Sequence, residues 1–99
     1  LFYCKGPDAS AVGEYTSEGF VVHKGSAARM GNVASIQGTS QARFRQQLVT
    51  DGVLIQQGTQ YVFTRDYLFS SPSMAAIAVL GRSANGWIEW KTEQGQTLD

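Results

Sequence analysis

Short runs of β-branched and aromatic residues alternate with glycine, proline and asparagine along most of the chain, a pattern typical of β-strands joined by turns. This pattern predicts strands at residues 1–5, 9–15, 19–26, 53–55, 60–64, 87–91 and 96–98. The first three have short connections and predict an antiparallel meander. A Gln-Gly-Thr turn at 57–59 predicts a hairpin, and a second hairpin is expected at the C-terminus.

A period of three to four residues appears at residues 40–51 and predicts a helix. Its apolar stripe is formed by Phe44, Leu48 and Val49. Thr39 or Ser40 can cap its N-terminus, and Gly52 can stop it. Residues 27–38 precede it without a clear period, so an ordered loop is expected there.

The stretch from Met74 to Leu80 contains no charged and no strongly polar side chain. A helix that is apolar on every face is surrounded by protein, so we expect this one to be the core helix. Ser71 can cap its N-terminus, Pro72 suits the first helical position, and Gly81 can take the left-handed conformation that ends it.

Together these elements predict an α+β fold, a small single domain with about six or seven antiparallel strands and two helices, one of them buried. Residues 1–38 would form the β-meander and loop. Residues 39–99 would form the helix, hairpin, core helix and C-terminal β-hairpin. In the strand expected at 87–91, alternation places Ile88 and Trp90 on one face and the other three residues on the opposite face.

Charge and composition limit the partners and the compartment. Eight Lys and Arg residues balance eight Asp and Glu residues, so no global basic field attracts nucleic acid or anionic lipid, although a local basic patch stays open. The sole cysteine, Cys4, cannot form an internal disulfide, which fits a reducing, cytoplasmic setting. No signal peptide or membrane-spanning run is apparent. The chain begins at Leu1 in what reads as mid-strand, so we expect a domain cut from a longer protein.

The titratable residues form no recognisable catalytic or metal-binding set. His23 is the sole histidine and lies in an expected strand, and Cys4 in its apolar run reads as a small hydrophobic residue. The acidic residues are scattered at turns and strand ends, which is a solvated pattern. We therefore expect no enzyme, no catalytic residue, no metal and no cofactor.

Recognition-type residues instead gather at the two polar ends of the core helix. The candidate nucleic-acid contacts are Ser73, Arg82, Ser83, Asn85 and Lys91. Serine hydroxyls suit phosphates, Arg and Asn suit base edges, and tryptophan stacks on bases. A structural interpretation stays open, in which the serines cap the helix, Asn85-Gly86 forms a turn and the tryptophans fill the core.

Arg43 and Arg45 fall largely away from the apolar stripe of the helix at 40–51. They are candidates for a second nucleic-acid contact face. The alternative is an ordinary solvated helix surface.

Several motifs carry a resemblance to a known family. They are Phe20-Val21-Val22-His23-Lys24-Gly25-Ser26, Phe69-Ser70-Ser71-Pro72-Ser73-Met74-Ala75-Ala76, Gly81-Arg82-Ser83-Ala84-Asn85-Gly86-Trp87-Ile88-Glu89-Trp90-Lys91 and Gly95-Gln96-Thr97-Leu98. With these motifs the chain resembles domain-of-unknown-function family 4357 over essentially its whole length. Members of that family are typically found C-terminal in GIY-YIG nuclease-family proteins and near restriction-modification systems.

The second half is also similar to the restriction-enzyme and adenine-methylase associated (RAMA) domain. Ser71-Pro72-Ser73 and Asn85-Gly86-Trp87 carry that similarity, while Met74 stands where alanine is more usual. The RAMA domain is proposed to recognise DNA, including modified DNA.

These resemblances imply a non-catalytic accessory domain of a nuclease or restriction-modification-linked protein that contacts DNA. The adjacent domain of the parent protein would be a second partner, and no membrane partner is expected. The nuclease motif is absent from the chain, so any cleavage would belong to another domain. The alternative is a protein-interaction or structural module that packs against the parent nuclease domain or a partner. This alternative predicts an exposed apolar patch in place of a basic one.

Overall fold

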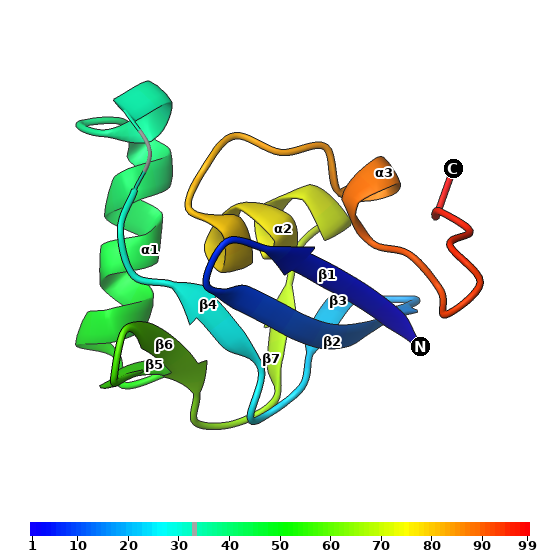
Figure 1. The fold of residues 1–99 in the computed structure, drawn as a ribbon, viewed down its shortest axis with the longest axis horizontal. Coiled ribbons are helices and arrows are strands. Elements are labelled where there is room, and N and C mark those ends of the chain that lie inside the picture. Colours follow the sequence, from blue (N-terminus) through cyan, green and yellow to red (C-terminus); the bar gives the residue numbers. More distant parts are fainter. Residues whose placement is uncertain (33) are drawn as a thin grey trace.

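The computed structural model describes residues 1–32 and 34–99 and confirms the α+β prediction (Figure 1). In chain order the elements are β1 (Phe2–Gly6), β2 (Ala9–Thr16), β3 (Gly19–Val22), β4 (Ala27–Arg29), a 3₁₀ turn (Ala34–Ile36), α1 (Ser40–Thr50), β5 (Leu54–Gln57), β6 (Gln60–Phe63), β7 (Tyr67–Phe69), α2 (Pro72–Leu80) and α3 (Gly86–Glu89). No helix in the described part of the chain is long and apolar enough to cross a membrane.

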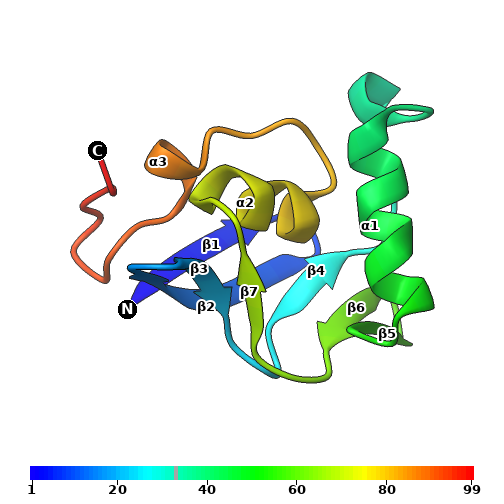
Figure 2. The same cartoon turned by 180° about the vertical axis from the view of Figure 1, so that it is seen from behind.

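The seven strands that the structure describes pair antiparallel in one sheet, six of them in the order β5-β6-β4-β2-β3-β7 and β1 beside β2 off this path. β2 is the hub of this sheet, because β1, β3 and β4 all pair with it. The N-terminal meander and the β5–β6 hairpin are thereby confirmed. α2 lies over the sheet, with α1 and α3 on either side of it (Figures 1 and 2).

The core helix α2 forms with the predicted ends. The Oγ of Ser71 accepts the N–H of Met74 at 3.1 Å, Pro72 occupies the first turn, and Gly81 closes the helix with a φ of 69°. Residues 75–80 are all buried. Three of these six residues are alanines, whose small side chains let the helix backbone approach the sheet closely.

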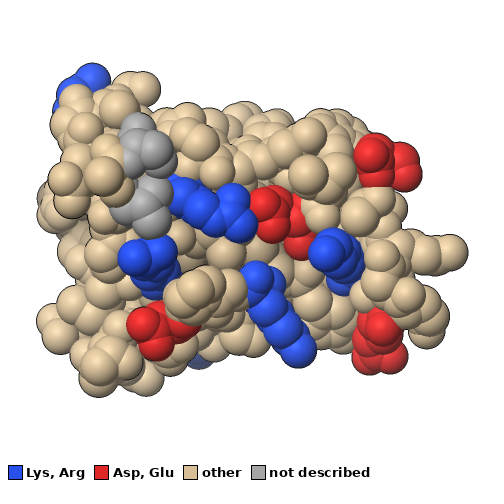
Figure 3. All heavy atoms as spheres, turned by 45° about the horizontal axis from the view of Figure 1, so that its top comes forward, with Lys and Arg blue, Asp and Glu red and all other residues tan. Residues whose placement is uncertain are grey.

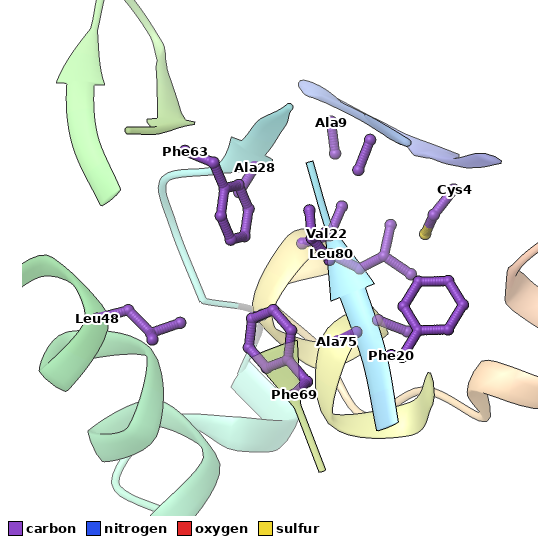
Figure 4. Packing of buried hydrophobic residues seen from close by; sticks show 14 of the residues in the cluster. Cys4, Ala9, Phe20, Val22, Ala28, Leu48, Phe63, Phe69, Ala75 and Leu80 are labelled. Atoms are coloured by element: carbon purple, nitrogen blue, oxygen red, sulfur yellow. The ribbon is translucent and has the colours of Figure 1, made fainter. Parts of the chain in front are cut away.

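Aromatic side chains from the strands pack against α2 in the core (Figure 4). Phe20, Phe63 and Phe69 are fully buried, and the ring of Phe20 lies 4.4 Å from that of Trp90. Each buried ring of this kind contributes about 2 kcal/mol to the free energy of folding. Trp90 therefore fills the core, whereas Trp87 is 39% exposed, so the structural interpretation of the tryptophans is confirmed for Trp90 alone.

The loop expected at residues 27–38 is wrong in part, because β4 and the 3₁₀ turn lie within it; residue 33 of this prediction falls outside the described residues. β4 has no alternation of its own, and pairing with β2 and β6 stabilises it. The strand expected at 19–26 ends at Val22, since Gly25, with a φ of 89°, turns the chain toward β4. β7 was not predicted as a strand and forms by pairing with β3.

The predicted C-terminal hairpin is wrong at residues 87–91, most of which form helix α3. Asn85 starts this helix, because its Oδ1 accepts a backbone N–H two residues later at 3.0 Å. The predicted alternation of faces is therefore also wrong, and Trp90 is buried while Ile88 is 48% exposed. Of the expected hairpin, the described residues retain one bridge at Lys91.

Candidate nucleic-acid interface

The segment after α2 folds back onto the start of α2. Ser73 accepts the N–H of Gly86 through its Oγ at 2.9 Å, and the Nε1–H of Trp90 donates to the Pro72 carbonyl at 3.0 Å. A side chain at position 86 would overlap the backbone of Pro72 and Ser73, so glycine lets α3 lie directly against α2. The half-buried candidate Ser73 thus positions α3.

An ion pair between Arg82 and Glu89 links the start of the segment after α2 to the end of α3. The Nη1 of Arg82 lies 3.0 Å from the Oε2 of Glu89 and also donates to the Ser83 carbonyl at 3.2 Å. The Arg82 side chain is 40% exposed, so this ion pair adds less than about 1 kcal/mol of stability. A guanidinium carries five N–H donors, which leaves Arg82 with donors for a ligand.

Ser83 and Asn85 lie between these two ends and are exposed. The Oγ of Ser83 donates to the Oε1 of Gln41 on α1 at 3.0 Å. Asn85 uses its Oδ1 to cap α3, and its NH₂ group has no hydrogen-bond partner among the described residues. Asn85 can therefore cap the helix and donate to a ligand at the same time.

A groove of about 470 Å³ lies beside β1. Backbone pairing builds it, because the Tyr3 N–H donates to the Lys91 carbonyl at 2.7 Å and the Lys91 N–H donates to the Tyr3 carbonyl at 3.0 Å. This pairing brings the candidate Lys91 to the same groove as Lys5 of β1. The rest of the lining is Tyr3, Glu89, Thr92, Glu93 and Gly95. Lys5 was not predicted from the sequence, since its partners in the groove come from the far end of the chain.

Lys5, Arg82 and Lys91 gather on one surface, which we call the basic face. Arg82 pairs with Glu89 at 3.0 Å, and Glu89 lines the groove together with Lys5 and Lys91. Figure 3 turns the segment between α2 and α3 toward the viewer and shows lysine and arginine side chains spread over this side, with acidic side chains between them. The candidates Arg82 and Lys91 are thus brought together.

A family model, the domain of unknown function DUF4357, matches residues 2–99. The chain belongs to the DUF4357 family. No curated protein and no solved structure matches the chain. Because the match spans every strand and helix described above, the basic face is built from the DUF4357 domain itself.

Of the second contact face predicted for the DUF4357 domain, Arg45 is wrong, and Arg43 stays a prediction. Arg43 is exposed, but Arg45 is only 3% exposed. The guanidinium of Arg45 donates to the carbonyl oxygens of Arg29, Gly31 and Ala78 and to the Oδ1 of Asn32. Burial lowers the pKa of Arg45 to about 10, which still leaves the side chain charged at neutral pH. Arg45 thus fastens the segment after β4 to α1 and α2 and cannot reach a ligand.

Two further titratable groups of the DUF4357 domain are Cys4 and His23. Cys4 is fully buried, and burial raises the pKa of its thiol to about 12, so it is protonated at neutral pH and is a poor nucleophile. The Nε2 of His23 lies 3.6 Å from the Oε1 of Glu14 in a partly exposed pair. The described residues contain no group of three or more His, Cys, Asp or Glu side chains that could hold a metal ion. The arrangement suits binding through charge and hydrogen bonds.

Proposed function

We propose that this domain is a non-catalytic module that contacts DNA. The observation that carries the proposal is the basic face, in which Lys5 and Lys91 line one groove with Glu89 and Arg82 pairs with that same Glu89. Lysine and arginine side chains in such an arrangement suit phosphate oxygens, and phosphate contacts supply essentially all of the non-specific affinity for DNA. Ser83 and Asn85 add hydrogen-bonding groups beside Arg82.

The proposal includes the setting in which the domain works. We infer that it is an accessory domain of a GIY-YIG nuclease-family or restriction-modification-linked protein, in the cytoplasm, with the neighbouring domain of that protein as a partner. The likeness of Ser71-Pro72-Ser73 and Asn85-Gly86-Trp87 to the RAMA domain supports this setting. Any cleavage of DNA would come from another domain of the parent protein.

Fluorescence anisotropy with labelled duplex and single-stranded DNA tests the proposal. Three neutralised phosphates correspond to a slope of about −2.7 in log affinity against log salt on duplex DNA, or a loss of about forty-fold between about 50 and 200 mM salt. Lys91→Gln is expected to lower the magnitude of that slope by about 0.9.

Lys24→Gln is the matched control for this titration. Lys24 is exposed, lies beside Asp66 and does not line the groove, so its replacement is expected to leave the slope unchanged. An absence of binding to every DNA, with or without base modification, would contradict the proposal.

A second candidate function is packing against the parent nuclease domain or another protein. Ile55 on β5 and Leu68 on β7 favour it, because they are 44% and 46% exposed on strands at the two ends of the sheet order. Packing of another domain against these two strands would remove both side chains from water. The double variant Ile55→Ser, Leu68→Ser is then expected to lower the melting temperature of the full parent protein more than that of this domain alone. Equal effects would argue against packing at these positions.

A further inference from the structure

Two hollows of the surface meet at Tyr3. The groove of about 470 Å³ lies beside β1, and a second hollow of about 310 Å³ lies next to it. Both are lined by Tyr3, Thr92 and Glu93. Tyr3 thus contributes to both hollows, which suits a flat ligand that stacks on the ring and a chain that continues into the neighbouring hollow.

We propose that this groove holds an unpaired nucleotide of a DNA strand, with its base stacked on Tyr3. The inference rests on the proposed function, and it adds the form of DNA and the class of base. Grooves for single strands combine cationic side chains that follow the backbone with aromatic rings that stack on bases. Bases inside a duplex are already stacked on each other and cannot occupy such a groove.

The positions of the lysines fit the phosphates of one such nucleotide. Lys5 lies two residues from Tyr3 on the same strand and therefore on the same face of β1. Lys91 pairs with Tyr3 across the neighbouring segment. Cations thus flank Tyr3 along the strand and across it, while the Tyr3 hydroxyl lies 3.4 Å from the Oε1 of Glu93. Phosphates on either side of a stacked base would meet one lysine each.

The acidic residues of the groove indicate which base is held. Glu89 and Glu93 line the groove, and their carboxylates would repel phosphates but can accept hydrogen bonds. The exocyclic amino groups of cytosine and adenine are donors to carboxylates of this kind, whereas thymine presents an oxygen and a methyl group in the same place. The groove should therefore prefer a base that carries an amino group.

Anisotropy with labelled oligo(dC), oligo(dA) and oligo(dT) of about ten nucleotides, and a duplex, tests the inference. We expect oligo(dC) and oligo(dA) to bind several-fold more tightly than oligo(dT). Tyr3→Leu removes the ring and is expected to weaken oligo(dC) binding by about tenfold, within the range measured for loss of one stacked base. Tyr3→Phe keeps the ring and should bind like the unaltered protein, and thermal unfolding checks that both variants fold.

Two further measurements separate the parts of the inference. Glu93→Gln removes the carboxylate and should reduce the preference for oligo(dC) over oligo(dT). Two phosphate contacts predict a slope of about −1.4 in log affinity against log salt for the single strands. Duplex binding with no preference among single strands, or with no effect of Tyr3→Leu, would overturn the inference and leave the proposed function intact. Binding to no DNA would overturn both.

Discussion

Two regions of the molecule use basic side chains in opposite ways. Beside α1, the guanidinium of Arg45 is enclosed by three backbone carbonyls and one amide oxygen. Beside β1, Lys5 and Lys91 are exposed at an open groove. In these two regions the surrounding acceptors, and not the charge, decide whether a basic side chain is structural or free to bind. The carbonyls of Arg29, Gly31 and Ala78 hold Arg45 inside, and water solvates the lysines.

The chemistry of the two side-chain types explains the division. A guanidinium is planar and offers five N–H donors in a fixed fork, so Arg45 can satisfy several carbonyls at once. A lysine ammonium is a compact, strongly hydrated charge that suits an exposed phosphate contact. Each region is therefore expected to respond to mutation in a different measurement, the first in stability and the second in binding.

The largest expected effect comes from removing the enclosed guanidinium of Arg45. Arg45→Met keeps an unbranched apolar stem and removes every guanidinium donor, including the one to the buried Ala78 carbonyl. We expect a loss of about 3 kcal/mol in the free energy of unfolding, measured by chemical denaturation. Arg43→Met on the same helix is the control, because Arg43 is exposed and its replacement should cost less than about 0.5 kcal/mol. Equal effects of the two substitutions would remove the contrast between the regions.

A pH titration tests the burial of the Cys4 thiol, which lies on β1 between the groove residues Tyr3 and Lys5. Burial raises the pKa of Cys4 from 9.0 to about 12, so the unfolded chain releases this proton first as the pH rises. The contribution of the protonated thiol is complete below pH 9 and is lost by up to about 1.4 kcal/mol per pH unit as the pH rises toward 12. The stability difference between the unaltered protein and Cys4→Ala should therefore shrink between pH 9 and 10. A constant difference would mean that the thiol titrates normally.

A smaller effect is expected where the groove region is joined to the core. Ser73→Ala removes the acceptor of the Gly86 N–H and should cost about 1 kcal/mol in thermal or chemical unfolding. Because Ser73 is half-buried and positions α3, the salt slope for DNA should stay the same once the protein is folded. A change in slope without a change in stability would instead make Ser73 a direct contact.

The smallest stability effect belongs to the exposed lysines. Lys5→Gln and Lys91→Gln should each change the free energy of unfolding by less than about 0.5 kcal/mol. Both are expected to weaken DNA binding, which reverses the pattern expected for Arg45→Met. A strong loss of stability in either variant would show that the groove lysines, too, are structural.

Local chemistry made α2 predictable from the sequence. Ser71, Pro72 and Gly81 fix its two ends through contacts within a few residues, and its apolar composition places it in the core. α3 was not predictable in this way, because Gly86 and Trp90 are held by the first turn of α2. A segment that reads as a strand from its own residues becomes a helix when distant partners offer better hydrogen bonds.

Prediction of the candidate site from the sequence was limited in the same way, by contacts between distant parts of the chain. Arg82 and Lys91 were predicted from their local setting, and the structure brings them to one surface. Lys5 could not be predicted, because its neighbours depend on pairing across the chain. The spacing of Arg45 indicated burial, although its charge suggested a solvated position. It lies three and four residues before Leu48 and Val49 and so shares their apolar face.

The pairing of Tyr3 with Lys91 has a consequence for when the domain becomes able to bind. One wall of the groove comes from β1 and the other from residues 89–95. Tyr3 and Glu93, one from each wall, are 90 positions apart. Contacts of such long range form late, because the loop between them must first be ordered. The second wall follows Trp90, which completes the core against Phe20, so the groove forms together with the last part of the core. DNA binding is then acquired in the final step of folding, and partly folded chains do not bind the ligand.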